Sequence, residues 1–373
     1  EIHLAVNYSY TSNPDGEDEQ KDFKNETTKG IIESANFLLY GVPGCGKSFK
    51  VADEYESKIT SEQNKVRVVF HPDYTYSDFV GQLMPVLKKL PNEQEEKLQY
   101  EFVPGPFTQI LETAYAEPEQ QCLLIIEELN RGNAPAIFGE IFQLLDRNDD
   151  GTSRYAIYNR DISMVLYDEP NKLIKLPPNL TIVATMNTSD QNVFTMDTAF
   201  QRRWQMKHIP NRFTGKFLDD KTITHVAKHL PNSDISWGVF AQTVNKKMHT
   251  ANLGFGGTDD KSLGVYFATD NDLDDAERFA EKVLKYLWDD AFKLGRQALF
   301  SNCSEGLSSV IEAYEDAKGD PLKAVLVPEV YNEMQKRMLE LAAEQPKVAE
   351  EEPAEAAEDA DADNPVQEPA DEE

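Results

Sequence analysis

The residues best suited to chemistry lie in GVPGCGKSF at 41–49, which matches the pattern GxxxxGK[ST] and follows an apolar run. Glycines let such a loop curl with its N–H groups directed inward, and the helix that follows adds its positive dipole end. We expect Lys47 to reach the β- and γ-phosphates of a nucleotide and Ser48 to bind Mg²⁺. The candidate nucleotide-binding residues are Gly41, Val42, Pro43, Gly44, Cys45, Gly46, Lys47, Ser48 and Phe49. A glycine-rich turn that matches by chance is the alternative, and the preceding apolar strand argues against it.

A second candidate element is CLLIIEELNR at 122–131, where a short apolar run ends in two acids, Glu127 and Glu128. In phosphate-loop NTPases an acidic residue at a strand end helps to hold Mg²⁺, and a neighbouring polar group orients the attacking water. We therefore expect Glu127 and Ser48 to be metal ligands and Glu128 to be the general base. An aspartate is usual at the first position, so Glu127 places its carboxylate one methylene further out. The alternative is an acidic strand end that is simply solvated. That is less expected, because two acids at the end of a buried strand are unusual unless a cation binds them.

A third polar group lies in TMNTSDQNVFTMDTAFQRRW at 185–204. The segment starts as a buried strand, turns polar at Asn187 and Asp190, and ends on the adjacent arginines Arg202 and Arg203. Taken alone, the segment fits a purely structural interpretation as well as a functional one: a strand, a turn and a helix with a solvated end. The phosphate-loop motif and the acidic strand end supply the context that such a segment needs. A shared active site is therefore the stronger hypothesis.

The composition limits the possible functions of the chain. Its 373 residues are 40% hydrophobic and carry a formal net charge of −29, which argues against a broad basic surface for wrapping duplex DNA. There is no apolar run long enough to span a membrane and no signal peptide at Glu1, so we expect no membrane contact. Three widely spaced cysteines and six scattered histidines fit neither a disulfide framework nor a zinc site. A cytoplasmic protein is the simplest interpretation.

Short apolar runs alternate with helical patterns in the first half of the chain, which predicts an α/β fold with a parallel sheet. The expected strands are NFLLY, VRVVFH, CLLIIEEL and LTIVATMN, and the clearest helix is expected at 135–147. Two inserts interrupt this order: a polar loop is expected within 85–106, and a hairpin is expected within 151–177. The predicted divisions are an irregular leader at 1–29, a nucleotide-binding core at 30–211, a helical lid subdomain at 212–345 and a disordered acidic tail at 346–373.

Together these motifs resemble the AAA+ P-loop NTPase domain of the McrB family, the GTP-driven motors of methylation-dependent restriction systems. The resemblance covers roughly residues 31–300. It rests on GVPGCGKSF, FHPDYTYSDFVG, IIEELNRGNAPAIFGEIFQLLD and MNTSDQ with its following MDTAFQRRW, and more weakly on DKSLGVYF and YLWDD. The phosphate loop is common to many NTPases, whereas the MNxxD and FHxxYxYxDF elements are more specific to this family.

The resemblance implies a homo-oligomeric ring, usually a hexamer, with nucleotide between neighbouring subunits. It implies that Asn187 senses the γ-phosphate or the attacking water, and that Asp190 supports catalysis with the help of an McrC-like nuclease partner. Arg202 and Arg203 would then face the neighbour's nucleotide, one or both as an arginine finger. Arg131 is a weaker candidate for the subunit interface. Contact with DNA would be made by the assembled complex or by an upstream domain that this sequence lacks.

Other functions remain open at this stage. The absence of an NKxD guanine signature leaves GTP and ATP as alternative substrates. A MoxR- or midasin-type ATPase that remodels protein complexes would also suit the acidic surface. A nucleotide-dependent scaffold with weak hydrolysis is the third alternative, because of Glu127.

Overall fold

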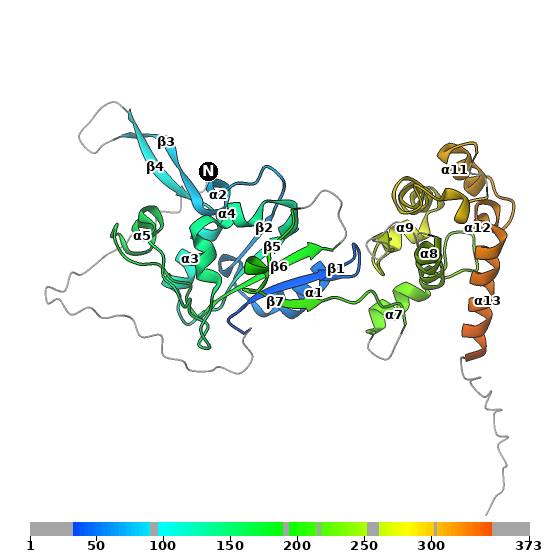
Figure 1. Cartoon of the computed structure of the whole chain (residues 1–373), viewed down its shortest axis with the longest axis horizontal. Helices are drawn as coiled ribbons and strands as arrows, with labels where there is room; N and C mark the ends of the chain where they lie inside the picture. Colours follow the sequence, from blue (N-terminus) through cyan, green and yellow to red (C-terminus); the bar gives the residue numbers. More distant parts are fainter. Residues whose placement is uncertain are drawn as a thin grey trace, which may run out of the picture.

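The structure, a computed structural model, describes residues 33–89, 96–188, 194–214, 218–251, 261–301 and 304–344. It consists of an α/β core and a helical lid that follows it along the chain (Figure 1). Within the described ranges, none of the helices has the length and apolar character needed to cross a bilayer.

The core is built on a five-stranded parallel sheet in the order β2-β5-β6-β1-β7. Its strands are β1 (Asn36–Gly41), β2 (Lys65–Val69), β5 (Cys122–Glu127), β6 (Leu180–Asn187) and β7 (Gln205–His208). Four of them were predicted from their apolar runs. The edge strand β7 was not predicted, because its sequence QMKH is short and mainly polar and its residues are mostly exposed.

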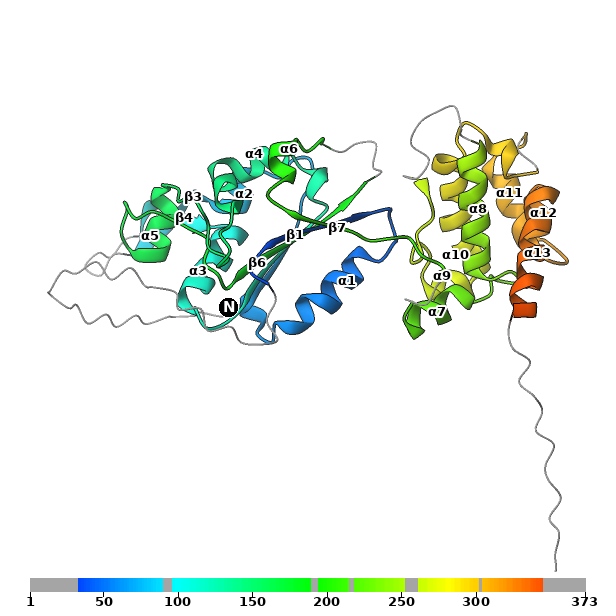
Figure 2. The ribbon, with the colours of Figure 1, turned by 60° about the horizontal axis from the view of Figure 1, so that its bottom comes forward.

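Alternate residues of the central strands pack on opposite faces of the sheet. Leu38, Leu124 and Ile182 face a core formed with α3 (Pro106–Ala116) and α4 (Ala134–Phe138). Phe37, Leu123 and Val183 belong to a second core that includes Val51 of α1 (Lys47–Glu54). Figure 2 shows α1 lying along one side of the strands β1, β6 and β7. Burial on both faces explains why these strands are continuously apolar.

The helix expected at 135–147 is interrupted. After α4 the chain takes a positive φ of 50° at Gly139, where an added Cβ would lie 2.9 Å from the Tyr76 ring. It then continues as a 3-10 helix at Gly139–Leu145. The periodic apolar residues identified the buried face correctly, but the break depends on a tertiary contact.

The structure corrects both expectations about the inserts. The first insert is an antiparallel hairpin of β3 (Gly81–Lys89) and β4 (Glu96–Pro104), so most of the stretch expected to be a polar loop forms strands. Residues 90–95, between the two strands, lie outside the described residues. Leu83 lies opposite Phe102, and Leu87 lies opposite Leu98, on the same face. The second insert contains α5 (Arg160–Tyr167) and one isolated bridge, Ile157 with Ile174, rather than a hairpin. The remaining short core helices are α2 (Tyr76–Val80) and α6 (Thr198–Gln201).

The lid is a helical bundle with its own hydrophobic core, which includes Trp237, Phe240, Leu287 and Tyr314. Its α-helices are α7 (Asp220–Ala227), α8 (Trp237–Ala251), α9 (Asp270–Asp274), α10 (Ala276–Phe279), α11 (Leu307–Glu315), α12 (Pro321–Val325) and α13 (Pro328–Glu344). Two π-helical segments, Ala280–Leu284 and Leu287–Ala291, extend α10.

Candidate active site

The phosphate-binding loop connects β1 to the N-terminus of α1, as its motif predicts. Gly44 and Gly46 have φ values of 74° and 97°, a left-handed conformation that side chains disfavour. The loop therefore turns its backbone toward the first turn of α1, where free N–H groups and the helix dipole favour an anion.

Lys47 is buried, and its Nζ donates hydrogen bonds to the carbonyls of Gly41 at 3.1 Å and Val42 at 2.9 Å. These bonds fix the ammonium group beside the loop. Cys45 is also buried, and burial raises the pKa of its thiol although Lys47 nearby acts in the opposite direction. The thiol is therefore protonated at neutral pH, and Cys45 serves as a small packing residue in the loop.

The second acidic element lies beside this loop at the same edge of the sheet. Glu127 ends β5, and Ser48 Oγ lies 3.4 Å from its Oε2. A hydroxyl and a carboxylate oxygen are donors that Mg²⁺ prefers, so the pair fits the expected metal shell. Glu127 also accepts a hydrogen bond from Thr185 and forms an ion pair with Arg67, whose other nitrogen contacts Glu56 at 2.6 Å. The longer glutamate side chain thus reaches Arg67 on β2 while it stays next to Ser48.

Glu128 takes a left-handed backbone conformation, with φ 55° and ψ 45°. Such a conformation is costly for a residue with a side chain, and it is often found at functional sites. Asn187 Nδ2 donates to both carboxylate oxygens of Glu128 at 2.9 Å, and Arg131 Nε pairs with Oε2 at 3.1 Å. Asn187 is positioned in turn by Asn130, which donates to its carbonyl at 2.8 Å. The structure therefore brings the predicted base and the predicted sensor into direct contact.

The remaining predicted residues are placed differently from one another. Asp190 lies outside the described residues. Arg203 is bound within its own chain: it pairs with Asp146 at 2.8 Å, donates to the Ala199 carbonyl at 2.7 Å and stacks over Phe142 at 3.9 Å. Arg202 is exposed at the end of α6. The two adjacent arginines thus have different surroundings, which the sequence did not reveal.

The lid contacts the phosphate-binding loop through the segment 263–267. Tyr266 donates its backbone N–H to the Gly44 carbonyl at 2.7 Å, and its ring lies where a Cβ on Gly46 would be 3.2 Å away. Gly264 packs so closely that an added Cβ would lie 2.3 Å from backbone atoms of Pro43 and Gly44. The lid is therefore packed directly against the phosphate-binding loop.

An aromatic cluster borders the same loop. Phe49 is 43% exposed, and its ring centroid lies 6.3 Å from that of Tyr266. Lys221 Nζ lies 5.1 Å from the centroid of the Phe49 ring. Tyr266 stacks on His225 at 5.3 Å. The side of the loop that faces α7 is thus aromatic.

Sequence reasoning missed Arg67 and Thr185 at Glu127, and it assigned Arg131 only to a subunit interface. Arg67 gave no signal in the sequence, because it is a single polar residue between the valines of β2. It precedes Val69, the register partner of Glu127, by two positions. Tyr266 had a signal, since the matched segment DKSLGVYF contains it, but its contact with the loop is a tertiary feature.

Comparisons with known proteins agree with this geometry. Residues 36–204 match the AAA domain of the dynein-related subfamily. The chain is 37% identical over 302 residues to the type II restriction enzyme BsuMI component YdiS of Bacillus subtilis (strain 168), covering 75% of this chain and 85% of that protein. It is 29% identical over 188 residues to the type IV methyl-directed restriction enzyme EcoKMcrB subunit of Escherichia coli (strain K12). The chain belongs to the McrB-like AAA+ proteins of restriction systems.

The McrB-like family assignment confirms the α/β P-loop fold and a nucleotide-binding function. The matched AAA domain runs from the start of β1 to Trp204, so it contains both acidic residues and Asn187 but not the lid. The match to the Escherichia coli protein covers 50% of this chain and 37% of that protein.

Proposed function

We propose that this McrB-like protein hydrolyses GTP or ATP at the edge of the sheet where β1, β5 and β6 end. The observation that carries the proposal is the convergence of Lys47, Ser48, Glu127, Glu128 and Asn187, contributed by the phosphate-binding loop and two neighbouring strands. Gly41 and Asn187 are register partners in the sheet, which places the loop and the sensor side by side.

In this mechanism the loop N–H groups and Lys47 would bind the phosphates, and Ser48 and Glu127 would hold Mg²⁺. The bound metal ion would neutralise charge that develops on the phosphoryl oxygens. Glu128 accepts a proton from the attacking water, and Asn187 orients both the carboxylate and that water. An ionised carboxylate accepts about four hydrogen bonds, so Glu128 can receive the water while it keeps its contacts with Asn187 and Arg131.

The subunits of this protein would form a ring, usually a hexamer, with Arg202 reaching the nucleotide of the next subunit. Arg202 is the better finger of the two arginines because it is exposed, whereas Arg203 is held by Asp146. Asp190 would support the reaction in the assembled complex. A finger contributed by a neighbour is worth about 10³–10⁵ in rate, so an isolated subunit should be a poor enzyme.

The wider role would be to drive DNA translocation in a restriction or phage-defence complex, together with an McrC-like nuclease that cuts the DNA. The similarity to two restriction-enzyme components supports this role over remodelling by a MoxR- or midasin-type ATPase. Contact with DNA would be made by the assembled complex.

Hydrolysis assays with Glu128→Gln test the proposal. We expect Mg²⁺-dependent hydrolysis of GTP or ATP by the wild-type protein. In the variant, hydrolysis should fall by about 10²–10⁴ while equilibrium binding of the nucleotide is retained. A Glu140→Gln variant is the matched control, since Glu140 lies away from the site beside Tyr76. A wild-type protein that binds nucleotide but hydrolyses neither substrate, with or without an McrC-like partner, would instead be a scaffold.

A further inference from the structure

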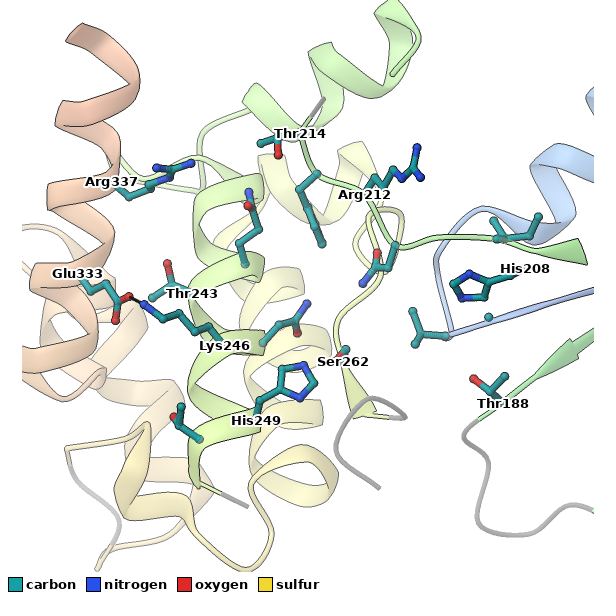
Figure 3. Close-up of a pocket in the computed structure, with 18 of the residues that line it drawn as sticks. Thr188, His208, Arg212, Thr214, Thr243, Lys246, His249, Ser262, Glu333 and Arg337 are labelled. Atoms are coloured by element: carbon teal, nitrogen blue, oxygen red, sulfur yellow. Dashed lines mark hydrogen bonds and ion pairs between the residues drawn. The ribbon is translucent and has the colours of Figure 1, made fainter. Parts of the chain in front are cut away.

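A large cleft lies between the core and the lid, and most of its lining residues take no part in the mechanism above. Its volume is about 1220 Å³, and it opens between the ends of β1, β6 and β7 on one side and helices α8 and α13 on the other (Figure 3). On the core side it reaches Gly41 and Val42, the first residues of the phosphate-binding loop.

The cleft is positively charged although the protein as a whole is strongly acidic. Four permanent cations line it, and two carboxylates, Glu333 and Glu340, oppose them, which leaves a formal charge of about +2 with its two histidines neutral. The cations are Arg212, Lys246, Lys336 and Arg337, and the histidines are His208 and His249. The chain has a net charge of −29, so a cationic concave surface indicates an anionic ligand.

The carboxylates of the cleft can be displaced by a better anion. Lys246 pairs with Glu333 at 2.6 Å, and Arg337 pairs with Glu340 at 3.2 Å. All four side chains are at least 40% exposed, and ion pairs between exposed groups contribute only about 0–1 kcal/mol. An incoming chain of carboxylates can therefore exchange with them at little cost.

The sequence itself supplies such a chain. Residues 350–373 contain twelve Asp or Glu and no Lys or Arg. They follow α13, the helix that carries Lys336 and Arg337 on the wall of the cleft. Arg337 is about 10 Å along the helix axis from Glu344, and an extended chain covers roughly 3.3–3.6 Å per residue. The acidic segment can thus reach every basic residue of the cleft.

We propose that the acidic segment 350–373 binds in the cleft between the core and the lid, where it holds off other polyanions. A cleft of only about +2 in so acidic a protein attracts a free polyanion weakly, whereas a tethered one has an effective concentration in the millimolar range. This favours the protein's own segment over a nucleic acid. Because the cleft reaches Gly41 and Val42, a bound segment would lie beside the phosphate-binding loop.

Carbodiimide cross-linking of the full-length chain tests the placement without any need for hydrolysis. We expect peptide mapping to find acidic-segment carboxylates joined to Lys246 and Lys336, and these products to disappear in 0.5 M salt, where screening shortens to roughly 4 Å. The exposed lid lysines Lys293 and Lys318 lie outside the cleft and are the matched controls. Cross-links spread equally over all four lysines would overturn the proposal.

A second measurement decides between the acidic segment and a nucleic acid. In a full-length variant, the twelve acidic residues of 350–373 are replaced by Asn and Gln, and binding of a fluorescent single-stranded 20-mer is measured by anisotropy. The proposal predicts that the variant binds the oligonucleotide about tenfold more tightly than wild type, and that adding Lys246→Gln and Arg337→Gln removes the gain. Equal binding by the wild type and the variant, through the same two residues, would assign the cleft to nucleic acid instead.

Discussion

Adjacent arginines with opposite roles provide the sharpest test of the site geometry. Arg203→Ala removes an ion pair to Asp146, a hydrogen bond to the Ala199 carbonyl and a cation–π contact with Phe142. The Arg203 side chain is only 10% exposed and that of Asp146 is 25% exposed, so Asp146 would be left poorly solvated. A charge-assisted bond at a partly buried site contributes about 1.5–3 kcal/mol, and the ring contact contributes about 0.5–1 kcal/mol. We expect a total loss of about 2–4 kcal/mol in the free energy of unfolding.

Thermal and urea unfolding, followed by circular dichroism, measure this loss. For a core of this size it corresponds to a decrease of roughly 5–10 °C in Tm. Arg202→Ala is the matched control, and we expect it to change stability by less than about 0.5 kcal/mol because its side chain is exposed. A double-mutant cycle with Asp146→Ala should show a coupling energy of about 1–3 kcal/mol. Equal stability of the Arg203 variant and wild type would refute the placement of this side chain.

Three further predictions concern the lid and the loop. Gly264→Ala should weaken equilibrium nucleotide binding by about tenfold, because its Cβ would lie 2.3 Å from the loop backbone and the lid must move away; Gly295→Ala, which meets nothing within 4 Å, should bind as wild type does. Cys45 should react with iodoacetamide at pH 8 much more slowly than free cysteine, since burial raises its pKa; rapid labelling of the folded protein, detected by mass spectrometry, would contradict this. Partial burial opposes ionisation of Asp272, but hydrogen bonds from Lys282 and Thr269 outweigh it and lower its pKa to about 2. Because its pKa is lower in the folded state, ionised Asp272 stabilises the fold at pH values above its ordinary pKa of 3.8, and this stabilisation is lost as the pH falls toward 2. The difference in urea midpoint between wild type and Asp272→Asn should therefore vanish as the pH falls from about 4 to about 2. A constant difference over that range would contradict the assignment.

The parts of the fold that depend on local pattern were predictable. Three of the five strands, β1, β5 and β6, are buried on both faces, so each is a short apolar run. The partly exposed β2 was still recognisable from the valines in VRVVFH. The phosphate-binding loop has a recognisable motif, because Gly44 and Gly46 take positive φ values that favour glycine. In contrast, β7 has no apolar run, and the β3–β4 hairpin leaves hydrophobic residues such as Leu87 and Tyr100 exposed. Neither element has the alternation of burial on which sequence interpretation depends.

The parts of the site that depend on tertiary contacts were not predictable. The motif residues Ser48, Glu127, Glu128 and Asn187 were identified because they end strands or begin a helix. Their partners Arg67, Thr185 and Tyr266 come from other elements, and nothing in their local sequence indicates which carboxylate or loop they contact. The distinction between Arg202 and Arg203 likewise requires the position of Asp146, which lies 57 residues away.

The most direct test of the central claim, that each active site is shared by two subunits, is nucleotide hydrolysis by mixed variants. Arg202→Ala subunits keep Glu128, and Glu128→Gln subunits keep Arg202, so each should be nearly inactive alone. In an equal mixture about a quarter of the interfaces combine both intact groups, and we expect hydrolysis to recover to about that fraction of the wild-type rate. Mixtures that stay as inactive as the separate variants at every ratio, although both variants fold and bind nucleotide, would contradict a site completed by Arg202 of the neighbour.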